Sequence, residues 1–413
     1  MIQNVLWVVS FFSLWLIIVW LQVMYLEEPK KRIRKDLPSF TIAVAAYNEE
    51  KTIEKTVSSI AKADYPKEKI EVIIVNDGST DKTAEVIETL IKKYKELDIQ
   101  LINKKNGGKA SAINIALKKA KGELFGVVDA DSRISTGCMK IIVKHFYESN
   151  VGAVISRIKV DKPNTLLERI QRFEYIMSNM IRKLMAAIGT LAMTPGVLSV
   201  YRTEIIRKLG GFDQNKANLT EDLEIAMRLK YHGYDVDMEP ESIVHTVVPP
   251  TLKGLWRQRI RWARGYIYNH WKYRSMFFSR KHSLFGLFQM PVNIIVLMLL
   301  IVNISILSWI FLSDAVEFVI RSITIEGYFM NSFFTLPSLR DTLLGQNLRI
   351  IFPVATVTLL GFYLIFISHR IFKERLAKHI LPIVTYFIFV PYFMTLNWIS
   401  SITQEVFNTK KKW

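Results

Sequence analysis

The sequence predicts an α/β domain with a parallel-type central sheet, accompanied by interfacial helices and about four transmembrane helices. Short β-branched runs alternate with helical patterns between residues 38 and 250, which is typical of a sheet covered by helices. Long apolar runs precede and follow that region. A hydrophobic content of 50% and a formal charge of +18 over 413 residues also exclude an ordinary cytosolic enzyme.

The first apolar run, residues 5–26, contains no charge and is long enough to span a bilayer, which takes about 20 apolar residues. It has neither the basic start nor the small-residue cleavage site of a signal peptide, so we expect a retained anchor. A basic segment, residues 30–35, follows it, and positive charge beside a span marks the cytoplasmic side. The amino terminus is therefore expected outside the cell and the next domain inside.

Three more spans are expected near residues 284–312, 350–368 and 380–400. They place the basic loop 369–375 inside but leave the basic tail, residues 410–412, outside, against the positive-inside tendency. Either a span is miscounted or the tail is a tolerated exception. The predicted division is a transmembrane helix, a cytoplasmic domain, interfacial helices and a transmembrane region, at residues 1–26, 27–250, 251–283 and 284–413.

Polar motifs follow three of the expected strands at the points where these strands end. The strands, at residues 41–45, 72–75 and 124–128, are short and apolar. The motifs that follow them are Tyr47-Asn48-Glu49, Asp77-Gly78-Ser79 and Asp129-Ala130-Asp131. Because ligands of parallel sheets bind at the carboxyl ends of the strands, we expect these motifs to share one crevice.

Asp129 and Asp131 are the best candidates for a metal site. In an extended segment, residues i and i+2 point to the same side, so both carboxylates can converge. Two such charges repel unless a cation neutralises them, and a hard divalent ion does this with oxygen ligands. Mg²⁺ and Mn²⁺ both accept such ligands, so both stay open. The only cysteine, Cys138, excludes a cage of thiolates and is expected to be a buried hydrophobe.

Two helix starts have both a structural and a functional interpretation. Lys109 follows two glycines, and a lysine at such a helix start suits an anionic diphosphate, although the spacing of an ATP-binding phosphate loop is missing. Asp222 lies in Thr220-Glu221-Asp222, which is either a reactive acidic motif or a helix start capped by Thr220. The residues alone do not decide between these interpretations.

An amphipathic helix is predicted over residues 255–271. Gln258, Arg261 and Trp262 are spaced at i, i+3 and i+4, so they share one face. The guanidinium can bind a diphosphate and the indole can stack on a sugar. The arginines of this helix, Arg264 among them, could alternatively rest on lipid headgroups.

The complete order of motifs resembles the membrane-bound inverting glycosyltransferases of family 2, which include cellulose, hyaluronan, chitooligosaccharide and poly-N-acetylglucosamine synthases. Thr-Glu-Asp with Gln-Arg-x-Arg-Trp is most similar to poly-N-acetylglucosamine and cellulose synthases. The resemblance covers residues 38–275 in detail and the spans in outline, and it implies a glycosyltransferase A-type fold. Residues 193–199 loosely match the family's loop at the acceptor end.

The resemblance also implies a role for each motif. UDP and the sugars would be bound by Tyr47, Glu49, Asp77, Lys109, Asp129, Gln258, Arg261 and Trp262. Asp131 would hold Mg²⁺ or Mn²⁺, and Asp222 would be the general base. Asp77 would accept a hydrogen bond from the uracil imide, Arg261 would stabilise the leaving diphosphate, and Trp262 would stack on the acceptor sugar.

The expected function is transfer of N-acetylglucosamine or glucose from a UDP-sugar to a growing β-linked polysaccharide that passes through the spans. The alternative is transfer of one sugar to a membrane lipid, because glycolipid synthases share Gln-x-x-Arg-Trp. The intact acidic positions disfavour an inactive scaffold. The expected partners are the donor, a glycan or lipid acceptor, membrane lipids and an accessory membrane subunit, with no nucleic acid. The expected location is the plasma membrane, and no cyclic-dinucleotide switch is expected.

Overall fold

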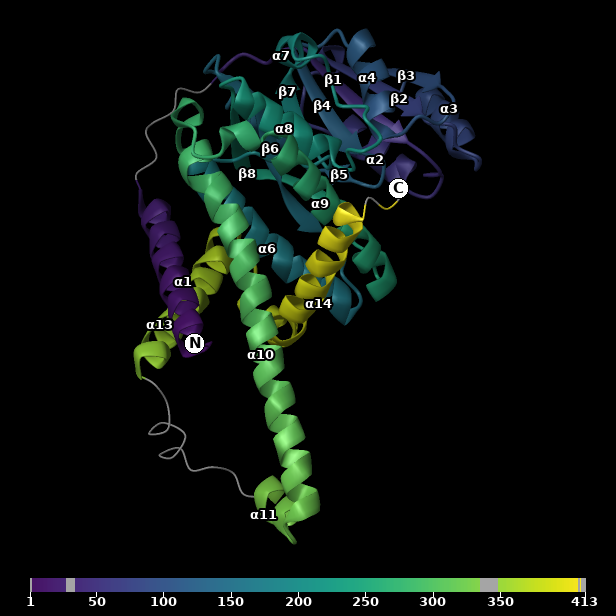
Figure 1. Ribbon diagram of the computed structural model, residues 1–413. Helices are drawn as coiled ribbons and strands as arrows, with labels where there is room; N and C mark the ends of the chain where they lie inside the picture. The colour runs from purple at the N-terminus through teal and green to yellow at the C-terminus, as the bar shows by residue number, and fades with distance from the viewer. Residues whose placement is uncertain (1, 27–33, 335–347, 408, 410–413) are drawn as a thin grey trace.

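A computed structural model describes residues 2–26, 34–334, 348–407 and 409 (Figure 1). The predicted orientation in the membrane depends on residues 30–33 and 410–412, which lie outside these ranges. The described chain forms an α/β domain at one end and a group of long helices at the other (Figure 1). Helix α1 (Ile2–Tyr25) lies beside α13 (Leu348–Ile371), so the first long helix packs with helices from the carboxyl-terminal part of the chain.

Eight strands in the described residues form one sheet, in the order β3-β2-β1-β4-β7-β6-β8-β5. Their bounds are β1 (Phe40–Ala46), β2 (Ile70–Asn76), β3 (Asp98–Asn103), β4 (Leu124–Asp129), β5 (Arg133–Ile134), β6 (Val151–Val160), β7 (Ser199–Arg202) and β8 (Asp235–Thr246). Strands β1 to β4 are parallel, as predicted. The sheet as a whole is mixed, because β7 runs antiparallel to β4 and β6, and β5 antiparallel to β8.

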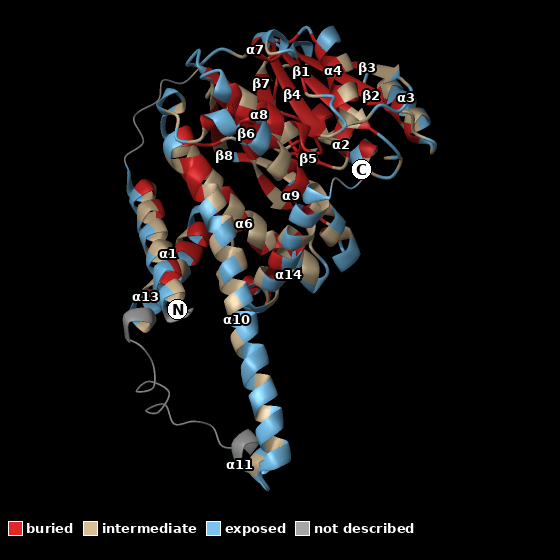
Figure 2. Cartoon of the chain, in the orientation of Figure 1, coloured by how far each residue is buried: buried red, intermediate tan, exposed pale blue. Residues whose placement is uncertain are grey.

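Helices cover both faces of the sheet because the strand side chains alternate between two apolar layers. Ile42 and Val44 of β1 belong to one layer and Ala43 to the other. The first layer is covered by α2 (Ile53–Ala61), α3 (Thr83–Lys93) and α5 (Cys138–Val143). The second is covered by α4 (Lys109–Lys119), α7 (Thr203–Lys208) and α8 (Glu221–Tyr231). Figure 2 shows the strands as the most buried part of the molecule, and Cys138 is buried as expected.

The register of the parallel strands brings their polar ends together. Ala46 at the end of β1 pairs with Asn76 of β2, and Ala45 pairs with Asp129 of β4. The three predicted motifs therefore begin at one edge of the sheet.

Two amphipathic helices connect the sheet to the long helices. Helix α6 (Leu166–Ala187) starts with a capping box in which Thr165 accepts a hydrogen bond of 3.2 Å from the Glu168 backbone. Met180 and Leu184 of α6 pack with Trp20 of α1 in a separate apolar cluster. Helix α9 (Leu252–Lys272) contacts both α8 and α14 (Ile380–Val406).

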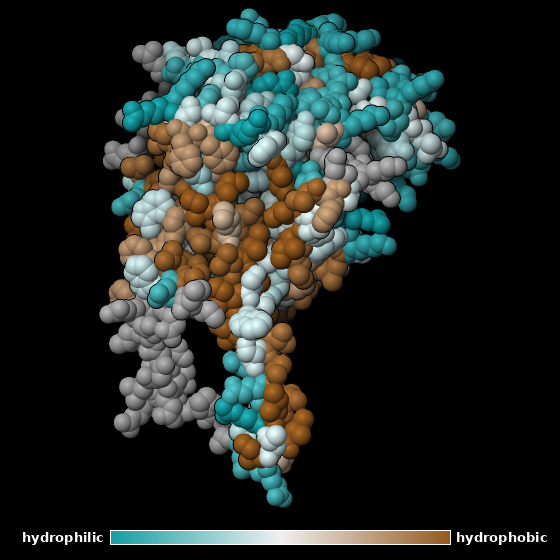
Figure 3. Space-filling model, viewed as in Figure 1, coloured by the Kyte–Doolittle hydropathy of each residue, from teal (hydrophilic) through white to brown (hydrophobic). Residues whose placement is uncertain are grey.

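Four helices in the described ranges are long and apolar enough to cross a membrane, which confirms the predicted number. They are Asn4–Tyr25, Phe285–Thr324, Ile351–Ile371 and Leu376–Val406. Their surface is largely apolar, in contrast to the polar α/β domain (Figure 3). The short helix α11 (Tyr328–Phe334) follows the second of them.

The second long helix does not end at residue 312 as predicted. After a π-helical turn, Phe285–Gln289, it continues as α10 (Met290–Thr324). The charges of Asp314, Glu317 and Arg321 end the apolar run in the sequence, but they are compatible with a helix. Glu317 pairs with Arg321 one turn later, which supports the extension.

Candidate active site

A cavity of about 370 Å³ begins at the carboxyl end of β4 and extends between α6, α8 and α9 to α14. Seven of the ten predicted site residues line it, namely Lys109, Asp129, Asp131, Asp222, Gln258, Arg261 and Trp262. Residues 193 and 195–197 of the loosely matched loop line it as well. The cavity therefore joins motifs that are separated by as much as 153 positions in the printed sequence, from Lys109 to Trp262.

Lys109, the first residue of α4, is held by two carboxylates. Its Nζ atom pairs with Asp129 and lies 3.6 Å from Oε1 of Glu221. Burial opposes the charge, but Asp129 and Glu221 outweigh it and raise the pKa of Lys109. Gly196 packs against this pair so closely that a Cβ atom there would lie 2.8 Å from Oδ1 of Asp129. The end of the cavity beside β4 thus carries a fixed cation.

Asp131 lies beside two other carboxylates. Burial, followed by repulsion from Asp129 and Glu49, raises the pKa of Asp131 to about 6. Burial is also the main cause of the raised pKa of Glu49. Such repulsion is what a divalent cation would relieve. No group of three or more His, Cys, Asp or Glu side chains that could hold a metal occurs in the described residues, so an ion here would need further oxygen ligands from a bound ligand or from water.

The other predicted base-binding residues do not line the cavity. The Tyr47 side chain is 50% exposed. Asp77 is 3% exposed, and its carboxylate pairs with Lys104 and accepts hydrogen bonds of 2.9 and 2.8 Å from the backbone N–H groups of Gly107 and Gly108. In this structure Asp77 orders the loop that leads into α4.

Thr220 is the N-cap residue of α8, but its side chain makes no capping hydrogen bond. Its hydroxyl instead accepts a hydrogen bond of 3.1 Å from Nδ2 of Asn269 on α9. Asp222 accepts one of 2.8 Å from the Leu223 backbone, and its own carbonyl accepts one of 2.6 Å from Thr194. The conformation of this acidic motif therefore depends on neighbouring segments rather than on a Thr220 cap.

Sequence reasoning missed Gly265 and Asn269, which hold α9 against the start of α8. A Cβ atom on Gly265 would lie 2.5 Å from Cγ2 and 2.8 Å from Cβ of Thr220. Asn269 donates to both the Asn218 side chain and Thr220. The spacing of these two residues, four apart on the face beside Arg261, was the available signal.

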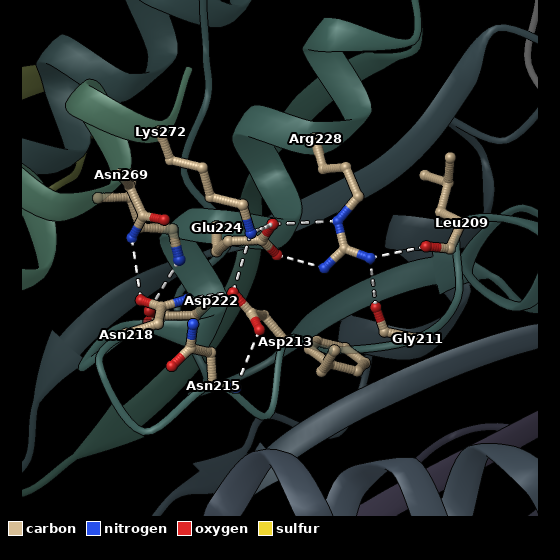
Figure 4. A network of polar contacts seen from close by, with 12 residues as sticks. Leu209, Gly211, Asp213, Asn215, Asn218, Asp222, Glu224, Arg228, Asn269 and Lys272 are labelled. Atoms are coloured by element: carbon tan, nitrogen blue, oxygen red, sulfur yellow. Dashed lines mark hydrogen bonds and ion pairs between the residues drawn. The ribbon is translucent and has the colours of Figure 1, made fainter. Parts of the chain in front are cut away.

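A buried carboxylate also links α8 to α9. Glu224 is completely buried and accepts hydrogen bonds of 2.8 Å from Lys272 and 2.6 Å from Tyr273. Figure 4 shows it between Lys272 and Arg228, and Arg228 in turn donates to the carbonyl groups of Leu209 and Gly211. This network fixes the helix that carries Asp222 relative to the helix that carries Arg261.

The arginines of α9 have separate environments. Arg259 is buried, donates a hydrogen bond of 2.8 Å to Glu174 of α6, and stacks over the Trp262 ring at 4.3 Å. Arg264 is also buried and pairs with Glu405 of α14 at 2.5 Å. The headgroup alternative is therefore wrong for Arg264, because its charge is used between two helices.

Several buried polar atoms that belong to cavity-lining residues have no hydrogen-bond partner in the described structure. They are Nε and Nη1 of Arg182, Oε2 of Glu221, Oε1 of Gln258 and Nη1 of Arg259. Buried polar atoms are normally paired, so their concentration at one cavity points to a ligand.

Curated proteins with similar sequences indicate which class of enzyme this site resembles. The chain is 30% identical over 239 residues to the poly-beta-1,6-N-acetyl-D-glucosamine synthase of Staphylococcus epidermidis RP62A, covering 57% of this chain and 56% of the relative. It is 34% identical over 265 residues to the probable glycosyltransferase YdaM of Bacillus subtilis 168, covering 62% of each. The chain thus aligns with less than two thirds of these relatives.

A solved structure shows the same fold over nearly the entire chain. The mannosyltransferase PcManGT from Pyrobaculum calidifontis, in complex with GDP-Man and Mn²⁺, gives a TM-score of 0.65 at 19% identity and covers 99% of this chain and 100% of its own. At this identity the likeness concerns the fold alone. Residues 38–265 match the family model described as "Glycosyltransferase like family 2". This match includes more than half of the chain, and the chain therefore belongs to glycosyltransferase family 2.

Proposed function

We propose that the protein transfers N-acetylglucosamine or glucose, with inversion, from a UDP-sugar to the end of a growing β-linked polysaccharide. The observation that carries this proposal is the single cavity in which Asp222 lies with the Lys109–Asp129 pair, Arg261 and Trp262. The names of the staphylococcal relatives favour N-acetylglucosamine.

In the proposed reaction Asp222 takes the proton from the acceptor hydroxyl. The acceptor oxygen then attacks the anomeric carbon, and the bond from that carbon to the diphosphate oxygen breaks on the opposite face. The electron pair leaves with UDP, where Lys109 and Arg261 offset the negative charge. Glu221, which pairs with Lys109, orients the segment that carries the base.

Asp131, with Asp129 beside it, is the proposed holder of Mg²⁺ or Mn²⁺. A divalent ion bound there would neutralise the donor diphosphate. Burial and the repulsion from Asp129 and Glu49, which together raise the pKa of Asp131, support this assignment. Glu49, Tyr47 and Asp77 are proposed to form the base-binding side, with Asp77 acting in part through the loop that it orders.

The α/β domain is proposed to be cytoplasmic in a multi-pass protein of the plasma membrane. Met394 and Trp398 of the candidate span α14 line the cavity, which supports passage of the product toward the membrane. The same opening would admit a membrane lipid, so transfer of one sugar to a lipid is the second candidate. An accessory membrane subunit and surrounding lipids remain proposed partners.

The test is to incubate purified, detergent-solubilised protein with radiolabelled UDP-sugars and to vary Mg²⁺, Mn²⁺ and EDTA. We expect UDP release with UDP-N-acetylglucosamine or UDP-glucose and a product of high molecular mass. A product that is extracted into organic solvent and carries one sugar would favour the lipid acceptor. Absence of UDP release from every donor would reject the proposed function, with Asp222→Asn as the background control.

A further inference from the structure

One wall of the cavity contains a guanidinium without a partner. Arg182 of α6 lines the cavity beside Tyr175. Its Nε and Nη1 atoms are buried, yet neither has a hydrogen-bond partner in the described structure. A buried donor that makes no hydrogen bond has lost its water without compensation, most of all when it is charged, so Arg182 is unfavourably placed unless a ligand accepts its hydrogen bonds.

Nearby side chains do not supply the missing hydrogen-bond acceptors for Arg182. Tyr175, Asp222 and Glu174 act on the charge of Arg182, but none of them forms a hydrogen bond or ion pair with it in the described structure, and Glu174 already accepts a hydrogen bond from Arg259. No ion pair of Arg182 occurs among the described residues, whereas Lys109 at the other end of the cavity is paired. Arg182 therefore differs from the donor-side cation in having free donors.

The position of α6 assigns this wall to the acceptor side. Met180 and Leu184, on the face of α6 opposite to Arg182, pack against Trp20 of α1, so α6 stands between the cavity and the first candidate span. The candidate span α14 contributes Trp398 to the same cavity. Asp129, on the proposed donor side, is instead the last residue of β4. An acceptor that reaches Asp222 from the membrane side would pass Arg182.

We propose that Arg182 binds the acceptor sugar, a role that rests on the proposed function. Its Nε–H and Nη1–H groups donate hydrogen bonds to hydroxyl or acetamido oxygens of the terminal acceptor residue. A guanidinium presents its donors in a planar fork, which suits two oxygens on one sugar. With Trp262 against the ring face, Arg182 holds the nucleophilic hydroxyl in reach of Asp222. Arg182 is thus a determinant of acceptor affinity, separate from the donor site.

The test uses the full-length protein in detergent with Arg182→Gln, Arg182→Lys and a matched control. Arg169→Gln makes the same substitution at an exposed position of α6 that is not part of the cavity. The acceptor is a short β-linked N-acetylglucosamine oligosaccharide, and the readouts are acceptor KM, UDP Kd and Tm. We expect Arg182→Gln to raise the acceptor KM about tenfold, with UDP Kd unchanged and Arg169→Gln like wild type.

The outcomes separate this inference from the proposed function. A wild-type protein that releases no UDP overturns both. An active wild type with an unchanged acceptor KM in Arg182→Gln, or with equal losses in acceptor and UDP binding, overturns only the role of Arg182. If Arg182→Gln lowers the Tm sharply, Arg182→Lys decides: it keeps the charge but loses the planar fork, so a raised acceptor KM supports the inference and an unchanged one rejects it.

Discussion

The two ends of the cavity differ in how their polar groups are satisfied. At the proposed donor end the Lys109 amino group pairs with Asp129 and lies beside Glu221, whose Oε2 atom has no hydrogen-bond partner in the described structure. At the end that faces α6 and α9, Arg182 and Gln258 retain atoms without partners. The cation at the proposed donor end is therefore held by protein carboxylates, whereas the guanidinium of Arg182 at the other end is incomplete until a ligand arrives.

This difference gives the two ends different sensitivities to substitution. At the donor end a changed residue alters charges that are already balanced against each other, so stability and binding change together. At the acceptor end a changed residue should affect turnover more than folding, because its contacts form with the ligand. Asp222 is the proposed base for the reaction between the two substrates, so its replacement should have the largest effect on turnover.

Asp222→Asn should reduce turnover about a hundredfold to ten-thousandfold, because the amide cannot take the acceptor proton. The substitution is nearly isosteric and keeps an oxygen that can accept the hydrogen bond from the Leu223 backbone. UDP affinity, measured by calorimetry, should stay near the wild-type value. A variant with more than half of wild-type turnover would show that the base lies elsewhere.

Gly265→Ala should reduce turnover about a hundredfold, because a methyl group there would collide with Thr220 and displace the segment that precedes Asp222. Gly361→Ala in α13 is the matched control, since nothing lies within 4 Å of the position of its added Cβ. Turnover and Tm of both variants should be compared. Equal, small losses in the two variants would contradict the close approach of α9 to α8.

Much of this site follows from local sequence, but the contact at Gly265 does not. The β-branched runs that end at Asp77 and Asp129 predict the parallel half of the sheet, because a short, continuous apolar run is typical of a strand that is buried on both faces. The mixed half was not predicted: β7 has only four residues, and β8 contains Pro240 and charged residues. The pairing of Arg264 with Glu405 joins helices far apart in the chain, which no local pattern records.

Substitution of Asp131 should change donor binding and stability together, in opposite directions. Asp131→Asn should weaken UDP binding in the presence of Mn²⁺ by about tenfold, because a carboxylate ligand is lost. The same variant should be more stable than wild type in EDTA at pH 7.5, since its side chain no longer buries a charge and no longer repels Asp129 and Glu49. UDP affinity across a metal titration and Tm in EDTA are the measurements.

The pH dependence of stability follows from the direction in which the pKa of Asp131 is shifted. The pKa of Asp131 is raised from 3.8 to about 6, so the folded protein holds this proton more tightly than the unfolded chain. The stabilisation is complete below pH 3.8 and is lost as the pH rises through 6, a difference of up to roughly 3 kcal/mol. The Tm advantage of Asp131→Asn in EDTA should therefore shrink as the pH falls from 7.5 toward 4. A constant advantage would locate its cause elsewhere.

Trp262→Ala should have the smallest effect of the four variants, and this effect should be a rise in the acceptor KM. The indole is 37% exposed, and Arg259 lies over its ring at 4.3 Å. Loss of an aromatic platform costs on the order of 1 kcal/mol, which corresponds to about a fivefold rise in acceptor KM. UDP affinity should barely change.

The Trp262 experiment also tests whether the two ends of the cavity act separately. If the indole were a membrane-interface anchor instead, its removal should lower Tm, UDP affinity and turnover together. Trp271→Ala is the matched control, because that indole is 70% exposed on the same helix and lies outside the cavity. A selective loss of acceptor affinity in Trp262→Ala, with little change in Trp271→Ala, would place the platform at the incomplete end of the cavity, where a ligand rather than the protein supplies the missing contacts.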